Sequence, residues 1–169
     1  GKWVDENIPV NPSSNRGLLR VKAENNWSGI SNLPLHIFRL AGIYGPNRSP
    51  FDKIRSGKAQ LVVKPGQFFS RIHVEDIARV LKASIEMPNY GSVYNVCDDM
   101  PAAPDEVLDY AAKLINYPDI PKVAFEEADL SPMAKSFYTD NKRVKNDRIK
   151  SELKITLKYP NFETGLNAL

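Results

Sequence analysis

The sequence has 169 residues, of which 42% are hydrophobic and 25% charged, and its formal net charge at pH 7 is +3. This length suits a single domain, and the apolar content with mixed charges excludes an intrinsically disordered chain. No apolar run approaches the ~20 residues that a membrane-spanning helix needs, and the small net charge does not indicate a nucleic-acid partner.

In the first half of the chain the pattern predicts a loop, a helix and a strand in succession. Prolines and small polar residues over residues 1–16 indicate an extended loop that ends at a helix cap. Apolar residues recur every four positions between Ser14 and Ile30, which predicts a helix. The apolar run over residues 35–40 predicts a strand, the glycine- and proline-rich residues 41–50 a loop, and residues 51–56 a short helix.

In the second half, the apolar runs 61–63 and 68–72 flank Pro65-Gly66 and together predict a β-hairpin. A helix is expected over residues 74–87, with one stripe of residues sharing a face. That stripe consists of Ile77, Val80, Leu81, Ser84 and Ile85. The remaining predicted elements are a strand over residues 92–97, a helix that begins at Pro104, a strand over residues 122–125 and a small helix near Glu163. This alternation belongs to the α/β or α+β classes, and a strand fed by a helix favours a parallel sheet.

Three stretches carry motifs: Phe38-Arg39-Leu40-Ala41-Gly42-Ile43-Tyr44-Gly45-Pro46, Arg71-Ile72-His73-Val74-Glu75-Asp76-Ile77-Ala78 and Val93-Tyr94-Asn95-Val96. In this order and spacing they resemble the extended short-chain dehydrogenase/reductase superfamily, to which the nucleotide-sugar epimerases and dehydratases belong. Residues 131–146 are similar to a bacterial subgroup of NAD(P)-dependent oxidoreductases of unassigned substrate. The resemblance covers essentially the whole chain.

The resemblance implies an α/β fold in which residues 1–169 form one unit, the C-terminal part of a Rossmann-type parallel sheet with a small α+β substrate-binding lobe. It also implies NAD or NADP as the cofactor. The family's Gly-x-x-Gly-x-x-Gly fingerprint is absent from the sequence, although glycines are what let backbone amides approach a pyrophosphate. The half that binds most of the cofactor and selects NAD or NADP is therefore expected upstream of Gly1.

The catalytic Tyr-x-x-x-Lys pair of the family is replaced. Alignment on Pro12, Gly17 and Glu24 puts Arg16 at the tyrosine position and Arg20 at the lysine position. Arginine stays protonated, so Arg16 cannot act as an acid or base. Arg20 is expected to hold a ribose hydroxyl or a phosphate of the cofactor, its alternative being an ion pair with Glu24. For Arg16 we favour an exposed helix face.

Further cofactor contacts are expected at the backbone of Leu40, Ala41 and Gly42, where small residues let the flat nicotinamide ring approach. Tyr44 is the candidate catalytic residue, as a substitute proton donor, because its loop should lie at the carboxyl end of a strand. The alternative is a tyrosine that packs the loop.

Arg48, Arg71 and His73 are the candidates for substrate binding. Arg71 resembles the arginine that grips a substrate phosphate in the nucleotide-sugar enzymes, and its alternative is an ion pair with Glu75 or Asp76. Arg48 lies in a loop that could close over a substrate or be simply solvated. His73, at a strand end, is more simply explained as a structural histidine.

Several other residues are expected to be structural. Asp76 should serve the dipole of the helix that follows it, and the basic residues 142–150 should be solvated surface. Cys97 is expected in the core, and a single cysteine cannot form a disulfide within the chain, which fits the cytoplasm. Two histidines do not make a histidine-rich metal site, so no metal is expected.

Two main hypotheses for function follow. The first is an NAD(P)-dependent oxidoreductase or nucleotide-sugar epimerase/dehydratase-like enzyme, whose small-molecule substrate is phosphorylated or a nucleotide sugar. The second is a non-catalytic NAD(P)-binding redox sensor or scaffold, because the usual catalytic pair is missing. A free-standing α/β binding module is a third alternative. The family also suggests a homodimer that uses the helix over residues 14–30.

Overall fold

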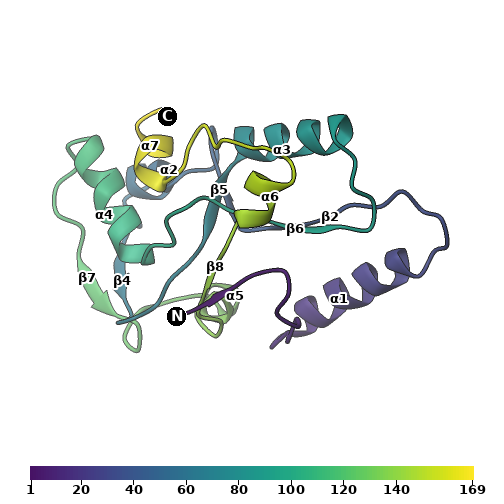
Figure 1. Ribbon diagram of the computed structural model, residues 1–169. Coiled ribbons are helices and arrows are strands. Elements are labelled where there is room, and N and C mark those ends of the chain that lie inside the picture. Colours follow the sequence, from purple (N-terminus) through teal and green to yellow (C-terminus); the bar gives the residue numbers. More distant parts are fainter.

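Short parallel strand pairs and seven helices make up the computed structural model, which describes residues 1–169 (Figure 1). The helices are α1 (Asn15–Ser28), α2 (Pro50–Arg55), α3 (Val74–Glu86), α4 (Pro104–Leu114), α5 (Pro132–Phe137), α6 (Asp147–Ser151) and α7 (Phe162–Leu166). The strands are β1 (Lys2–Val4), β2 (Ile37–Leu40), β3 (Gly42–Tyr44), β4 (Leu61–Val63), β5 (Arg71–His73), β6 (Val93–Val96), β7 (Lys122–Ala124) and β8 (Lys142–Val144). No helix is both long enough and apolar enough to cross a membrane.

All four strand pairs, β1–β8, β2–β6, β3–β5 and β4–β7, are parallel. The predicted α/β class with parallel strands is therefore confirmed. The β2–β6 pair is the longest, with Ile37 opposite Val93 and Leu40 opposite Val96. In Figure 1, α3 and α1 lie on opposite sides of this pair, as crossover helices do around a parallel sheet.

The predicted hairpin over residues 61–72 is wrong. Gly66 has a φ of 72° and turns the chain, but the two flanking strands do not pair with each other. Leu61 of β4 lies opposite Lys122 of β7, and Arg71 of β5 lies opposite Gly42 of β3. The turn at Gly66 agrees with the prediction, but the choice of partner strand depends on contacts with residues more than 25 positions away.

Two segments predicted as loops contain strands. Within residues 41–50, Gly42–Tyr44 form β3, and within residues 1–16, Lys2–Val4 form β1. Both strands have only three residues, too few for an alternating pattern to show in the sequence. Their pairing with β5 and β8, rather than their own propensity, makes them strands.

The long helices begin where local signals predict. The side chain of Ser14 accepts a hydrogen bond from the amide of Gly17 and caps α1. Pro104 opens α4, and Asp105 and Glu106 occupy its first turn, where carboxylates interact favourably with the helix dipole. These local signals explain why α1 and α4 begin within one residue of their predicted starts.

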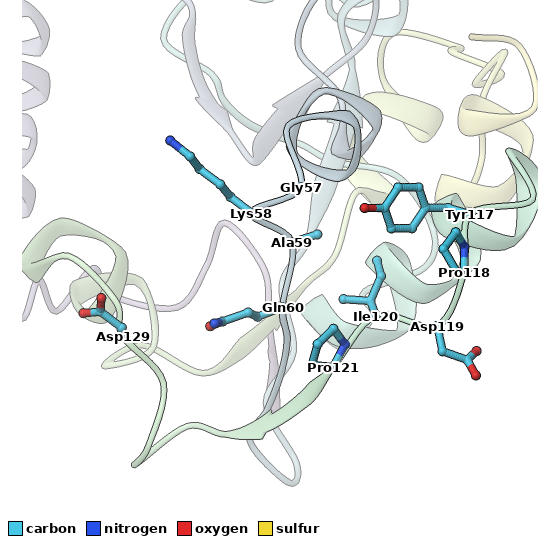
Figure 2. A pocket seen from close by; sticks show the side chains of 10 residues that line it. All are labelled: Gly57, Lys58, Ala59, Gln60, Tyr117, Pro118, Asp119, Ile120, Pro121 and Asp129. Atoms are coloured by element: carbon cyan, nitrogen blue, oxygen red, sulfur yellow. The ribbon is translucent and has the colours of Figure 1, made fainter.

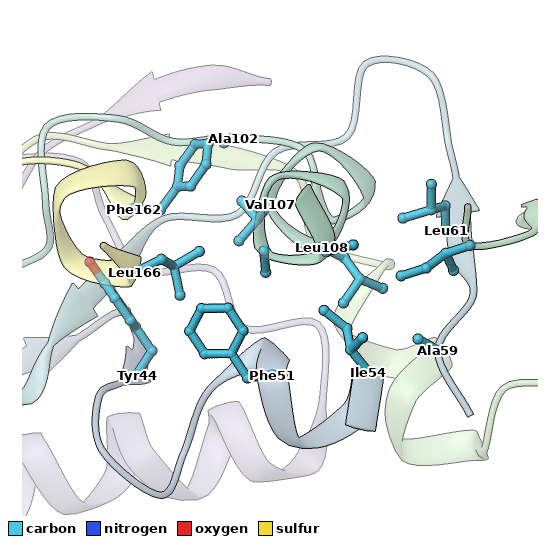
Figure 3. Close-up of a cluster of buried hydrophobic side chains, with 13 residues drawn as sticks. Tyr44, Phe51, Ile54, Ala59, Leu61, Ala102, Val107, Leu108, Phe162 and Leu166 are labelled. Atoms are coloured by element: carbon cyan, nitrogen blue, oxygen red, sulfur yellow. The ribbon is translucent and has the colours of Figure 1, made fainter. Parts of the chain in front are cut away.

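Three clusters of buried apolar side chains form the core. In the largest, shown in Figure 3, the α7 residues Phe162 and Leu166 and the α4 residues Val107 and Leu108 face Phe51 of α2. A second cluster joins β5, β6, α3 and α6 through residues such as Ile72, Tyr94, Val80 and Ile149. A third, small one consists of Val62, Ala128 and Tyr138.

The residues that α3 and α1 bury differ from those that the apolar pattern of the sequence predicts. In α3 the buried residues are Asp76, Val80, Ala83 and Ser84, while Leu81 and Ile85 of the predicted stripe are exposed. The buried face is turned because the Asp76 side chain packs inward under the chain segment at residues 158–159. No residue of α1 is buried, so the apolar side chains of Leu19 and Trp27 are exposed to solvent.

Candidate functional site

Leu40, Ala41, Gly42 and Arg71 lie together where the β2–β6 pair meets the β3–β5 pair, and we call them the junction site. The amide of Ala41 donates to the carbonyl of Val96 at 3.0 Å, which extends β2–β6 by one bond. One residue later Gly42 lies opposite Arg71. The junction site is therefore at the carboxyl end of β2 and β6, which is the edge where open α/β sheets bind ligands.

The surface of the junction site is open to a flat group. Leu40 and Gly42 are exposed. A β-carbon added to Gly42 would lie 3.3 Å from the carbonyl oxygen of Ser70, so the position is close-packed on one side. Backbone without a side chain lets a planar ring approach closely, and the site fits the nicotinamide end of a dinucleotide in this respect.

Arg71 is held by carbonyl groups and by no carboxylate. Its Nη1 donates to the carbonyls of Phe69 at 2.9 Å and Ala102 at 3.0 Å. The alternative ion pair with Glu75 or Asp76 does not form, because these carboxylates contact Lys158 and Arg79. Burial lowers the pKa of Arg71, and the negative charge of Asp98 opposes this effect. The guanidinium is thus fixed in place with its charge unneutralised by an ion pair.

Tyr44 is at the other end of β3, turned into the core. It is 7% exposed, and its hydroxyl donates to the carbonyl of Asn161 at 3.3 Å beneath α7. Burial raises the pKa of Tyr44, and the negative charges of Asp98 and Asp76 raise it further. These contacts correspond to the packing alternative for Tyr44, and a phenol in this position holds its proton.

His73 lies opposite Tyr44 in the β3–β5 register and is also buried. Its ring lies between those of Tyr44 and Tyr159, with centroid distances of 5.2 and 4.0 Å. Nδ1 accepts a hydrogen bond from the amide of Glu75 and caps α3, while Nε2 has no partner. Burial lowers the pKa of His73, which therefore favours the neutral ring.

Arg48 belongs to the same far end of β3. Its backbone exchanges two hydrogen bonds of 3.1 Å with Gly45, and its side chain is exposed. The structure thus separates the predicted site residues into two groups. Leu40, Ala41, Gly42 and Arg71 share the junction site, whereas Tyr44, Arg48 and His73 lie at the opposite end of the β3–β5 pair.

Arg16 and Arg20 are exposed on α1 and form no ion pair. The alternative pairing of Arg20 with Glu24 is wrong, because Glu24 binds Arg39 of β2 through Nη2 at 2.7 Å and Nε at 3.2 Å. Arg39 offers a two-nitrogen contact that is partly shielded from water, which an exposed neighbour on the same helix does not. Arg20 is consequently free to bind an anion.

Asp98 was not among the predicted site residues, although it lies two residues after the end of β6. Its amide donates to the carbonyl of Arg71 at 2.7 Å, which places it beside the junction site. It is 1% exposed, one carboxylate oxygen accepts from the amide of Met100, and Oδ2 has no partner. Burial raises the pKa of Asp98 to about 7. The sequence signal that points to Asp98 is its position in the acidic turn that follows a predicted strand.

Two hollows lie in the part of the structure that contains α2, α4 and α5. The larger, of about 570 Å³, lies between residues 57–60 and residues 117–121 and contains none of the predicted site residues (Figure 2). The smaller, of about 330 Å³, is bounded by α4, α5 and β4, and we call it the α5 hollow. No group of three or more His, Cys, Asp or Glu side chains is placed to hold a metal ion.

The proteins most similar in sequence have names that state no function. No family model matches the sequence. Protein YeeZ of Escherichia coli K12 is 27% identical over 159 residues, which is 93% of this chain and 53% of that protein. A functionally unknown conserved protein from Silicibacter pomeroyi has a solved structure with 59% identity and a TM-score of 0.97, covering 99% of this chain and 60% of that one. The chain thus spans between about half and two thirds of the length of these relatives.

More distant solved structures show the fold. A dTDP-glucose 4,6-dehydratase from Bacillus anthracis in complex with NAD is 21% identical with a TM-score of 0.77, over 99% of this chain and 54% of that one. A human epimerase family protein solved with NADPH is 17% identical with a TM-score of 0.78, over 98% of this chain and 58% of that one. The chain has the Rossmann-like α/β fold of these NAD(P)-binding proteins.

Proposed function

We propose that the intact protein is an NAD(P)-dependent oxidoreductase of the extended short-chain dehydrogenase/reductase superfamily, and that this chain supplies its nicotinamide-side and substrate-side surfaces. The observation that carries the proposal is the junction site. Leu40 and Gly42, which are both exposed, lie at the carboxyl end of two parallel strands, and Gly42 is opposite Arg71, which forms no ion pair with a carboxylate. The shared fold with epimerases and dehydratases supports it.

The residues of the junction site have separate roles in this proposal. The backbone of Leu40, Ala41 and Gly42 contacts the nicotinamide ring and shields one side of it from water. Arg71 holds an anionic group of the substrate, and its two carbonyl contacts orient the guanidinium for this purpose. Arg20, which is free on α1, binds a ribose hydroxyl or a phosphate of the cofactor. When bound, the nicotinamide accepts or donates a hydride.

A second candidate function rests on the proton-transfer groups. Arg16 stands at the position of the family's tyrosine and cannot exchange a proton at ordinary pH. Tyr44 is buried and donates its hydroxyl proton to the carbonyl of Asn161. None of the predicted residues near the junction site is thus a ready acid or base. A redox sensor or scaffold that binds NAD(P) without turnover accounts for this arrangement.

The experiment that tests the proposal is cofactor binding to the intact protein, measured by the fluorescence of NADH and NADPH. Gly42→Val should weaken binding at least tenfold, because a branched side chain covers the surface on which the ring lies. Gly29→Val is the matched control, since a β-carbon there also lies 3.3 Å from a carbonyl oxygen, at the end of α1. Equal affinities in the two variants would disprove the placement of the cofactor.

Turnover distinguishes the two candidate functions. An oxidoreductase should consume NADH or NADPH with at least one member of a panel of carbonyl compounds and sugar nucleotides. Tight cofactor binding that is sensitive to Gly42→Val, with no turnover across the panel, favours the sensor.

A further inference from the structure

Asp98 and Asp99, the two carboxylates of the turn after β6, lie in different environments. Asp99 is partly exposed, and its Oδ1 accepts from Lys150 of α6 and from the side-chain amide of Asn146. Asp98 is 1% exposed, forms no ion pair, and accepts one hydrogen bond of 3.2 Å from the amide of Met100, while its Oδ2 has no partner. A buried carboxyl group with an unsatisfied oxygen and no paired cation favours its neutral form.

The turn that contains Asp98 also holds Arg71 in place. The amide of Asp98 donates to the backbone carbonyl of Arg71 at 2.7 Å, and Nη1 of Arg71 donates to the carbonyl of Ala102 at 3.0 Å. Residues 98–102 therefore contact Arg71 both at its backbone and at its guanidinium. Burial lowers the pKa of Arg71, and the negative charge of Asp98 opposes this effect. The two side chains are thus neighbours whose charges interact although they form no ion pair.

Asp98 is the group of this cluster that changes its charge near neutral pH. The titratable and charged groups that face it come from β3, β5, α3 and the turn itself, and they are Tyr44, Arg71, Asp76, Cys97 and Asp99. Burial raises the pKa of Asp98 to about 7, which the charge of Arg71 opposes only in part. Burial also raises the pKa of Tyr44 and of Cys97, so both keep their protons, and Arg71 keeps its charge.

We propose that Asp98 couples the binding of an anion at Arg71 to the uptake of a proton from solvent. While the Asp98 carboxyl is neutral, the positive charge of Arg71 is available to the anionic group of a ligand. Once the carboxylate is ionised, it shares that charge and repels the ligand. Asp98 acts through Arg71 and is a positioning residue. The proposal rests on the proposed function, which assigns an anionic ligand to Arg71.

The direction of the pH dependence follows from these charges. Below the pKa of Asp98 the affinity for an anion is at its highest. As pH rises through about 7, binding requires either a proton or a second negative charge beside Arg71, so the affinity falls. Because coupling between two bound species is reciprocal, the bound anion raises the pKa of Asp98 by the same free energy. Anion binding near pH 7.5 should therefore take up a proton.

Sulfate is the probe, because its charge does not change between pH 6 and pH 8.5. It is titrated by calorimetry into the intact protein without NAD(P). The affinity should be at least fivefold higher at pH 6 than at pH 8.5. At pH 7.5, titrations in buffers of different ionisation enthalpy should show the uptake of roughly half a proton per sulfate. No sulfate binding at either pH, or binding without proton uptake, would overturn the proposal.

Variants assign the effect to Asp98. Asp98→Asn keeps an oxygen for the amide of Met100 and removes the titration, so its sulfate affinity should differ less than twofold between pH 6 and pH 8.5. Asp99→Asn is the matched control from the same turn and should keep the fivefold difference, since Asp99 is already paired with Lys150. Arg71→Gln should lose most of the affinity at both pH values. The same pH dependence in Asp98→Asn as in the native protein would refute the assignment, as would full affinity in Arg71→Gln.

The failure of this proposal and that of the proposed function are separable. Loss of NADH binding in Gly42→Val, with a sulfate affinity that does not depend on pH, removes the role of Asp98 and leaves the oxidoreductase standing. Proton uptake that Asp98→Asn abolishes, in a protein that binds neither NADH nor NADPH, keeps the role of Asp98 and removes the oxidoreductase.

Discussion

The fully buried carboxylate of Asp76, in the first turn of α3, accepts a hydrogen bond of 2.9 Å from the backbone amide of Tyr159. The neighbouring amide of Lys158 donates to the second carboxylate oxygen at 2.8 Å. These two bonds span more than 80 residues of sequence and hold the segment before α7 against α3. Asp76 thus joins two distant parts of the chain, beyond the helix-dipole role expected of it.

Asp76→Ala should lower the free energy of unfolding by roughly 2–4 kcal/mol, because it leaves the buried amide of Tyr159 and the partly buried amide of Lys158 without acceptors. Urea denaturation followed by circular dichroism measures the change. Glu75→Ala is the control, since Glu75 contacts Lys158 in an exposed ion pair and its loss should matter much less. A similar loss in both variants would show that the two amide bonds contribute little.

Gly165→Ala should destabilise the protein by about 1–3 kcal/mol through overpacking. A β-carbon at Gly165 would collide with the hydroxyl and ring of Tyr44, which lies under α7. The melting temperature of the variant tests this expectation. Gly29→Ala, at the exposed end of α1, should change it only slightly, and an equal shift in both would contradict the close contact with Tyr44.

Asp98 should make stability depend on pH between about 4 and 7. Its pKa is about 7 in the folded protein against an ordinary value of 3.8, so as pH rises through this window the unfolded chain releases this proton first. The contribution of Asp98 to stability therefore falls with rising pH. At pH 8 the Asp98→Asn variant should have a higher free energy of unfolding than the native protein. At pH 4 the difference in the free energy of unfolding between the two proteins should be smaller. Urea denaturation of both proteins at pH 8 and pH 4 tests this expectation. The same difference in the free energy of unfolding at both pH values would refute it.

His73 should act in the opposite direction at acid pH. Because burial lowers its pKa in the folded protein, the unfolded chain takes up the proton first as pH falls below about 6.5, and stability is lost. His73→Asn retains a side chain that can cap α3 and removes the titration. The variant should lose less stability than the native protein between pH 7 and pH 5. An unchanged pH dependence would exclude His73 as the cause.

Arg71→Ala should weaken the binding of an anionic ligand at least tenfold, about 1.4 kcal/mol, while the melting temperature changes little. Calorimetry with inorganic phosphate and thermal unfolding are measured on the same sample. Arg71→Lys should recover part of the affinity, since one charge remains. A large drop in melting temperature with unchanged affinity would make Arg71 a structural residue that ties Phe69 to Ala102.

Much of the secondary structure could be predicted because its causes are local. Ser14 caps α1 with its own side chain, and Pro104 opens α4 with a backbone angle that is already helical. Cys97, next to the apolar residues of β6, is buried as expected. Each of these features depends on only a few neighbouring residues, so a short stretch of sequence is sufficient to predict it.

The candidate site was predictable in part. Leu40, Ala41 and Gly42 follow a strand, and the residues after a parallel strand lie at the ligand-binding edge. That Arg71 lies beside them, while Tyr44 and His73 turn inward, depends on the register of β3 against β5. Asp98 and the α5 hollow were missed because burial and a cavity arise only from the packing of several elements.

The sequence by itself determined where the helices begin, which segments are apolar enough to be strands, and which residues follow β2. Local hydrogen bonds and periodic apolar residues are sufficient for these. Only the tertiary structure decided that β4 pairs with β7, that Glu24 binds Arg39 and that Arg71 lies opposite Gly42. Each of these is a choice among several partners of similar chemistry, and the choice is made by which surfaces the folded chain brings together and removes from water.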